Sequence, residues 1–162
     1  EHMISNALAA ASVGLAAGLP LEAVEEGLSC VELSPLRMEI TNSSSGVTVI
    51  NDTYNANPTS MKAAINSLSM LPGSGRKIAF LGLMAELGEQ SSQAHIEVGR
   101  HAEELGVEVV AVETELYGTA RIAKLDNVAA EIEGMNLDKN DAILFKASRV
   151  VGLETIVNDI VV

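Results

Sequence analysis

The chain has 162 residues, a net charge of −12 and 48% hydrophobic residues, of which very few are aromatic. This length is enough for one ordinary domain, whose core must be built from aliphatic side chains. The negative charge argues against nucleic-acid and anionic-membrane partners, because binding to either relies on Lys and Arg. No apolar run approaches the roughly 20 residues that span a bilayer. The single cysteine fits a reduced, cytoplasmic setting.

The N-terminal part of the chain is predicted to be helical and separate from the rest. Residues 3–17 are rich in Ala and Gly, which is typical of a closely packed helix, and a second helix is expected at 21–28. The pattern changes near residues 29–35. We therefore predict two parts, a helical segment of residues 1–30 and a larger domain of residues 31–162.

The larger domain begins with a predicted β-hairpin and continues as alternating strands and helices. The polar tract 42–46 lies between two alternating apolar segments, which indicates the hairpin. Further strands are expected at 77–81, 107–112 and 142–145, and helices at 58–71, 91–105, 114–135 (broken near Asp126) and 150–160. This alternation predicts a Rossmann-like α/β fold with a mostly parallel sheet and helices on both faces.

Residues 51–61 are the most informative stretch of the chain. They follow an apolar strand, open a helix, and carry Asp52, Tyr54, Asn55 and Asn57. Ligands of open α/β sheets bind at the carboxyl ends of strands. The Asp52 carboxylate could accept from ribose hydroxyls, or it could cap the helix. Its polar neighbours favour ligand binding.

A second polar cluster follows the strand at residues 142–145. Lys146, Ser148 and Arg149 provide three donors at a predicted helix start. A bound carboxylate or phosphate would explain cations at this end of a helix dipole, so an anion site is favoured over two solvated charges. For Arg37 the sequence leaves two interpretations open, contact with a phosphate or a position beside an edge strand.

Other chemistry is not supported by the motifs of this chain. Residues 73–77 (GSGRK) lack the spacing of a phosphate loop and precede a strand instead of following one. His95 and His101 lie six positions apart, about 600° of helical rotation, so they are expected on different faces. We therefore assign no catalytic residue and no metal ligand to this chain.

Several segments together resemble the Mur ligase family. They are His2 with residues 6–10 (NALAA), 37–39 (RME), 51–58 (NDTYNANP), 84–88 (MAELG) and 146–149 (KASR). The string at 54–58 is similar to the family member that joins D-alanyl-D-alanine to UDP-N-acetylmuramoyl-tripeptide in peptidoglycan synthesis. The resemblance implies a three-domain, ATP-dependent enzyme whose reaction passes through an acyl phosphate. This chain would hold the tail of the central ATPase domain and the complete third domain.

The resemblance also implies roles for individual residues. His2, Asn6, Arg37, Asp52 and Tyr54 would bind the nucleotide, with Asn6 at the adenine, Arg37 at a phosphate and Asp52 at the ribose. Asn55, Asn57, Lys146, Ser148 and Arg149 would bind the dipeptide substrate. ATP and Mg²⁺ are the implied cofactors, and the phosphate loop would come from a part of the enzyme outside this chain.

Three positions depart from the family pattern, namely Asn51, Leu83 and Ala147. Ala147 adds a methyl group at a close backbone approach where the family commonly has Gly. We expect the 162-residue chain alone to be inactive as a ligase. Two alternatives stay open, a non-enzymatic module that binds a nucleotide or carboxylate, and a related ligase with another amino-acid acceptor.

Overall fold

A computed structural model describes residues 2–31, 35–119 and 121–161, without the side chains of residues 2, 3 and 161. The chain divides into two compact units, Glu1–Ser34 and Pro35–Val162. Within the described ranges, no helix has both the length and the apolar character needed to cross a membrane.

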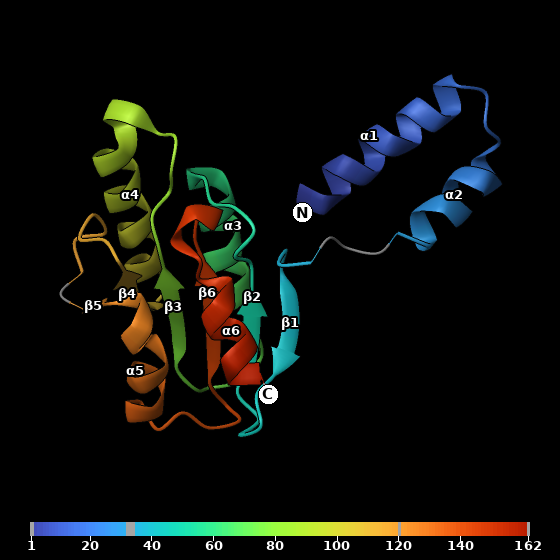
Figure 1. The fold of residues 1–162 in the computed structure, drawn as a ribbon. Helices are drawn as coiled ribbons and strands as arrows, with labels where there is room; N and C mark the ends of the chain where they lie inside the picture. The colour runs from blue at the N-terminus through green and yellow to red at the C-terminus, as the bar shows by residue number, and fades with distance from the viewer. Residues whose placement is uncertain (1, 32–34, 120, 162) are drawn as a thin grey trace. The chain divides into compact units, whose positions relative to one another are not determined.

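The first unit consists of two helices, α1 (His2–Ala16) and α2 (Leu21–Ser29) (Figure 1). The two pack closely at Gly14, where an added Cβ would lie 3.1 Å from Cγ2 of Val24. Large apolar side chains of α1 are nevertheless exposed, including Ile4, Leu8 and Val13. The predicted helices are confirmed, and they leave apolar surface uncovered within this unit.

The second unit is built on a six-stranded sheet with the order β1-β2-β6-β3-β4-β5. The strands are β1 (Glu39–Asn42), β2 (Thr48–Asn51), β3 (Lys77–Leu81), β4 (Glu108–Val112), β5 (Ile122–Ala123) and β6 (Ala142–Lys146). β1 pairs antiparallel with β2, and every other pair is parallel. The expected hairpin and the mostly parallel, Rossmann-like sheet are both confirmed.

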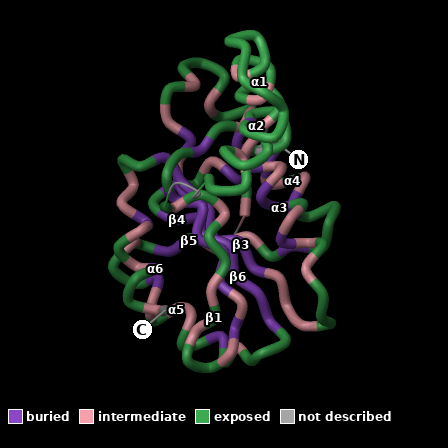
Figure 2. Tube along the Cα trace, turned by 90° about the vertical axis from the view of Figure 1, so that its right-hand side faces the viewer, coloured by how far each residue is buried: buried purple, intermediate pink, exposed green. Residues whose placement is uncertain are grey.

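Helices cover both faces of this sheet. α3 (Pro58–Ser69) and α4 (Ser91–Glu104) pack on one face, with a short 3-10 helix, η1 (Gly88–Gln90), before α4. α5 (Val128–Gly134) and α6 (Glu154–Val161) pack on the other. Successive strand residues alternate between the two cores, as Leu144 and Phe145 do. Figure 2 shows the inner strands of the sheet as the buried centre of the unit. Each fully buried Leu or Ile there contributes about 1.5–3 kcal/mol.

The connections create a switch point beside β6. α3 follows β2 on one face, whereas α6 follows β6 on the other, and β2 and β6 are direct neighbours. Chains that leave adjacent parallel strands toward opposite faces open a crevice at the carboxyl ends of those strands. Residues 52–57 and 147–149 therefore come together at this edge of the sheet.

The predicted helix at 114–135 is wrong in its first half. Residues 114–119 are irregular with one turn at 116–117, β5 pairs with the edge of β4, and a 3-10 helix, η2 (Leu125–Asn127), precedes α5. Glu113 has a positive φ of 56°, and its carboxylate accepts from the Leu125 N–H at 2.7 Å. In this segment, the backbone N–H and C=O groups form hydrogen bonds through strand pairing and through this turn, in place of the hydrogen bonds of a helix.

The last helix begins later than predicted. After β6 the chain forms a three-residue 3-10 helix, η3 (Arg149–Val151). Gly152 then adopts a left-handed conformation with φ 74°, and α6 begins at Glu154. A residue with this φ ends a helical turn, so the helical stretch is divided in two.

Candidate functional site

A buried ion pair lies at the centre of the switch point. Lys146 Nζ is 2.6 Å from Oδ2 of Asp52, and the two side chains are 2% and 12% exposed. Lys146 also donates to the main-chain oxygen of Asn55 at 2.9 Å. Burial lowers the pKa of Lys146, and the Asp52 carboxylate only partly opposes that effect. The ammonium group of Lys146 therefore interacts with protein groups and not with solvent, and its contacts connect β6 to the loop after β2.

Asp52 connects three segments of the chain. Its Oδ1 accepts from the Met38 N–H at 3.2 Å, and its own N–H donates to Phe145 O at 2.9 Å. It does not cap the following helix, because that position belongs to Asn57. The capping alternative for Asp52 is thus wrong, and its contact with a ribose stays a prediction.

Arg37 is held over an aromatic ring by an unusual backbone. The residues on either side, Leu36 and Met38, both have positive φ values, 63° and 50°. Hydrogen bonds from Tyr54 N to Leu36 O and from Met38 N to Asp52 hold this turn. The Arg37 Cζ then lies 4.1 Å from the Tyr54 ring centroid, within cation–π distance. Strained backbone of this kind persists where its surroundings over-determine it, often at binding sites.

A second guanidinium approaches the same ring. The Arg149 Cζ lies 5.8 Å from the Tyr54 centroid. Arg37, Tyr54 and Arg149 are all exposed, and neither arginine forms an ion pair within the described residues. We call these three residues the arginine–tyrosine cluster.

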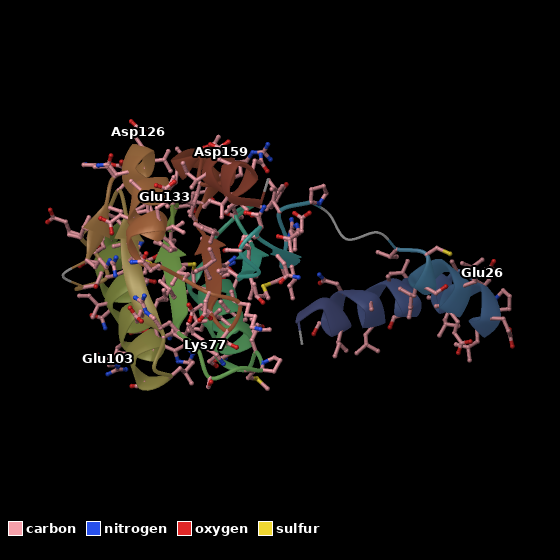
Figure 3. The ribbon with its side chains drawn as sticks, turned by 90° about the horizontal axis from the view of Figure 1, so that it is seen from below. Glu26, Lys77, Glu103, Asp126, Glu133 and Asp159 are labelled. Atoms are coloured by element: carbon pink, nitrogen blue, oxygen red, sulfur yellow. The ribbon has the colours of Figure 1, made fainter. Side chains whose placement is uncertain are left out.

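This cluster stands out against an acidic protein. The chain has ten Lys and Arg residues against 22 Asp and Glu. Exposed acids lie on the helices of this unit, as Glu103 of α4 and Asp159 of α6 do in Figure 3. Two like charges at one ring without a counter-charge repel each other, so a bound anion would be stabilised there.

Ser148 faces the interior of the protein. Its Oγ accepts from the Ala85 N–H at 2.9 Å and lies 3.5 Å from Ala56 O, and its N–H donates to Leu83 O at 2.9 Å. The predicted arrangement of three donors grouped at a helix N-terminus is therefore wrong. Lys146 and Ser148 are buried, and Arg149 starts only a single 3-10 turn. Whether these residues bind the dipeptide stays a prediction.

The two asparagines of the loop after β2 are exposed but have local structural roles. Asn57 Oδ1 accepts from Ser60 N at 2.9 Å, and Ser60 Oγ accepts from Asn57 N at 3.1 Å, which forms a capping box for α3. Asn55 Oδ1 accepts from Ala56 N at 2.8 Å. The capping role accounts for Asn57, while substrate contact by either residue stays a prediction.

The predicted adenine-binding residues lie in the first unit. Asn6 is exposed on α1. The side chain of His2 lies outside the described residues.

Two residues that the sequence did not assign to the site, His95 and Tyr117, contact the loop of residues 82–88. His95 is fully buried, and its ring centroid is 5.0 Å from that of Tyr117. The Tyr117 hydroxyl donates to Gly82 O at 2.7 Å, and burial raises the pKa of Tyr117. The sequence did carry a signal that His95 is buried: its spacing to Val98 and Ala102 is that of residues on one face of a helix, and this is the buried face of α4.

The side chains at this edge do not fit a magnesium site. Magnesium is usually bound through carboxylates and substrate phosphates. Asp52 is already neutralised by Lys146. In the parts of the chain that the structure describes, no group of three or more His, Cys, Asp or Glu side chains could hold a metal.

A family model described as "Mur ligase, glutamate ligase domain" matches residues 36–150. The chain belongs to the Mur ligase family. It is 36% identical to the UDP-N-acetylmuramoyl-tripeptide–D-alanyl-D-alanine ligase of Bacillus subtilis, over 99% of this chain and 38% of that protein. This Mur ligase chain thus spans well under half the length of that relative.

Solved structures show the same likeness. MurF from Acinetobacter baumannii superposes with a TM-score of 0.81 and 32% identity, over 99% of this chain and 37% of the other. MurF from Thermotoga maritima, solved in complex with ADP, has a TM-score of 0.74 and 28% identity, over 91% of this chain and 35% of the other.

Proposed function

We propose that this chain is the C-terminal part of a cytoplasmic, ATP-dependent ligase that joins D-alanyl-D-alanine to UDP-N-acetylmuramoyl-tripeptide in peptidoglycan synthesis. The observation that carries the proposal is the arginine–tyrosine cluster at the switch point. It offers two exposed cations to anionic groups at the edge where α/β folds bind ligands. The similarity to ligases of that name supports the choice of substrates.

The reaction needs positioning and charge stabilisation. The carboxylate of the tripeptide attacks the γ-phosphorus of ATP, the bond to ADP breaks, and an acyl phosphate and ADP are formed. The dipeptide amine then attacks the carbonyl carbon; the C–N bond forms, the C–O bond to phosphate breaks, and phosphate and the amine proton leave. Positively charged groups held in place before the reaction stabilise the negative charge that develops on these oxygens.

The cluster divides these tasks between its two cations. Arg37 contacts an ATP phosphate, and Arg149 holds the carboxylate of the dipeptide. Tyr54 keeps both guanidiniums at fixed positions through its ring. Asp52 accepts from the ribose, and Lys146 acts mainly by holding Asp52 and the Asn55 loop in place.

The remaining proposed contacts come from the flanking segments. Asn55 and Asn57 line the cleft between ATP and the dipeptide, Ser148 supports the dipeptide side of that cleft from its buried position, and His2 and Asn6 contact the adenine. Residues 1–30 form the tail of the central ATPase domain, and residues 31–162 form the C-terminal ligase domain. The exposed apolar side chains of α1 support this division, because protein outside this two-helix unit would cover them. The rest of the central domain supplies the phosphate loop and the groups that hold Mg²⁺.

The test compares the full-length enzyme with the 162-residue chain. Phosphate release and product formation are measured with ATP, UDP-N-acetylmuramoyl-tripeptide and either D-alanyl-D-alanine or L-glutamate. We expect the full-length enzyme to ligate the dipeptide and the short chain to be inactive. Ligation by the short chain would overturn its assignment as a partial enzyme. Preference for L-glutamate would favour another acceptor, and nucleotide binding without turnover would favour a non-enzymatic module.

Arg149→Ala in the full-length enzyme tests the dipeptide contact. We expect KM for D-alanyl-D-alanine to rise about tenfold or more, because a charge-assisted contact contributes roughly 1.5–3 kcal/mol. KM for ATP should change much less. The control is Arg100→Ala, which removes an exposed arginine on α4 that pairs with Glu104. Equal effects of the two variants would contradict the assignment.

A further inference from the structure

His95 links helix α4 to the carboxyl edge of the sheet. Its ring lies on the buried face of α4, under the loop of residues 82–88. We propose that neutral His95 is a positioning residue, which fixes the 82–88 loop and through it Ser148 in the arrangement needed for ligation. The inference rests on the proposed function, because it assigns His95 to the same site.

The hydrogen bonds of the ring define one tautomer. Nδ1 lies 2.6 Å from Ser91 O, a carbonyl that can only accept, so Nδ1 carries the proton. Nε2 lies 2.9 Å from the Met84 N–H, which can only donate, so Nε2 must be unprotonated. Both ring nitrogens are therefore satisfied only while the imidazole is neutral.

The loop passes this constraint on to the candidate site. On either side of Met84, Leu83 O accepts from Ser148 N and Ala85 N donates to Ser148 Oγ, both at 2.9 Å. Ser148 directly precedes Arg149 of the arginine–tyrosine cluster. It also reaches toward Ala56 in the loop after β2. Displacement of the Met84 amide would therefore shift the loop after β3, Ser148 after β6 and the loop after β2.

Protonation of His95 would break this arrangement. A proton on Nε2 would face the Met84 N–H, so that two donors would meet in a buried space. Burial lowers the pKa of His95, and the hydrogen bond to Ser91 opposes that shift. No charged side chain of the described residues contributes to the shift, and the titratable group facing the ring is Tyr117.

The sign of the pH dependence follows from this lowered pKa. Because the pKa of His95 in the folded state lies below its ordinary value near 6.5, the unfolded chain binds the proton more readily. The stabilisation by the neutral ring is complete above about pH 6.5. It is lost as the pH falls through the pKa of the folded state.

Substitutions in the full-length enzyme test the positioning role. His95→Leu removes the acceptor for Met84, and we expect kcat/KM for D-alanyl-D-alanine to fall about tenfold or more, since small displacements cost such factors. His95→Gln offers an amide oxygen to the same N–H and cannot take up a proton. It should retain most of the activity and flatten the decline of kcat/KM below pH 6.5. His101→Leu is the control, because His101 lies on the same helix and contacts Asn66.

The 162-residue chain provides a test that does not depend on activity or on a variant folding. Long-range ¹H–¹⁵N spectra report which ring nitrogen carries the proton, and amide exchange reports the protection of Met84. We expect a protonated Nδ1, a bare Nε2, and a protection factor at Met84 that falls as the ring titrates, once the intrinsic pH dependence of amide exchange is divided out. The protection factor of Ala111, in strand β4, should not change in that range.

The outcomes separate this inference from the proposed function. An Nε2-protonated ring, or a protection factor of Met84 that does not change on acidification, would overturn the role of His95 whatever the full-length enzyme does. If the His95→Leu enzyme ligates as actively as the His101→Leu enzyme, the role of His95 is also overturned, while the ligase assignment stays intact. Absence of ligation by the wild-type enzyme would remove the proposed function, while the spectra would still report on the loop.

Discussion

Asp52→Asn tests the buried ion pair at the switch point. The substitution keeps the shape of the side chain but leaves the Lys146 ammonium, 2% exposed, beside a neutral amide. Removing one partner of a buried pair costs about 3–5 kcal/mol. Since Asp52 is 12% exposed and Lys146 keeps the Asn55 carbonyl, we expect the free energy of unfolding to fall by about 3 kcal/mol, the lower end of that range.

Lys146→Met should have a different effect. It leaves the charge on Asp52, the more exposed partner, which still accepts from the Met38 N–H. We expect a smaller loss, about 1–3 kcal/mol. The double variant should lose less than the sum of the two single losses, because the residues are in direct contact.

The pH dependence of Asp52→Asn gives the sharpest check. In the wild type, the Asp52 carboxylate raises the pKa of Lys146 against the lowering effects of burial and Arg37. Without that carboxylate, only the lowering effects are left, so the folded variant releases the Lys146 proton more readily than the unfolded chain. Its stability should therefore rise relative to the wild type as the pH increases, by up to about 1.4 kcal/mol per pH unit.

Urea unfolding of the 162-residue chain, followed by far-UV circular dichroism at pH 7 and pH 9, measures these differences. Glu97→Gln, in the exposed pair with Lys62, is the control and should change the midpoint little. The reasoning is refuted if Asp52→Asn behaves like Glu97→Gln at pH 7. It is refuted equally if the deficit of Asp52→Asn is the same at both pH values.

Three further substitutions test the packing and the cluster. Gly82→Ala would place a Cβ 2.7 Å from Cβ of Ala147 and should cost about 1–3 kcal/mol in urea unfolding, whereas Ala147→Gly in the same chain should restore most of the loss. Tyr54→Ala should lower kcat/KM of the full-length enzyme by the equivalent of about 0.5–2 kcal/mol, while Tyr54→Phe, which keeps the ring, should behave as wild type. Asn57→Ala should cost about 1 kcal/mol of stability, and Asn57→Asp, which also caps helices, should cost much less. Full activity of Tyr54→Ala, or unchanged stability of either structural variant, would contradict these expectations.

Much of the secondary structure is determined locally. β3 occupies the predicted range because an apolar run is bounded by Gly75 and Gly82, and α3 starts at Pro58 because Asn57 caps it. The alternation of predicted strands and helices along the chain was sufficient to predict a parallel sheet with helices on both faces. These features depend on residues close together in the chain, so a single sequence carries their signal.

Where the sequence failed, the stabilising partner is distant. β5 has only two residues, Ile122 and Ala123, and exists through pairing with β4, so local sequence predicted a helix there instead. His95 has a backbone N–H as its partner, and no residue-type pattern marks such a contact. Tertiary packing overrides local preference at such positions.

The sequence alone determined which chemical groups gather after β2 and β6, because both clusters follow apolar strands of a parallel sheet. It could not determine which of those groups face outward. Lys146 and Asp52 are 94 positions apart, and only the adjacency of β2 and β6 brings them into contact. A buried cation must find a partner, so the fold uses Lys146 and Asp52 to hold the edge together. It leaves Arg37 and Arg149 exposed around Tyr54.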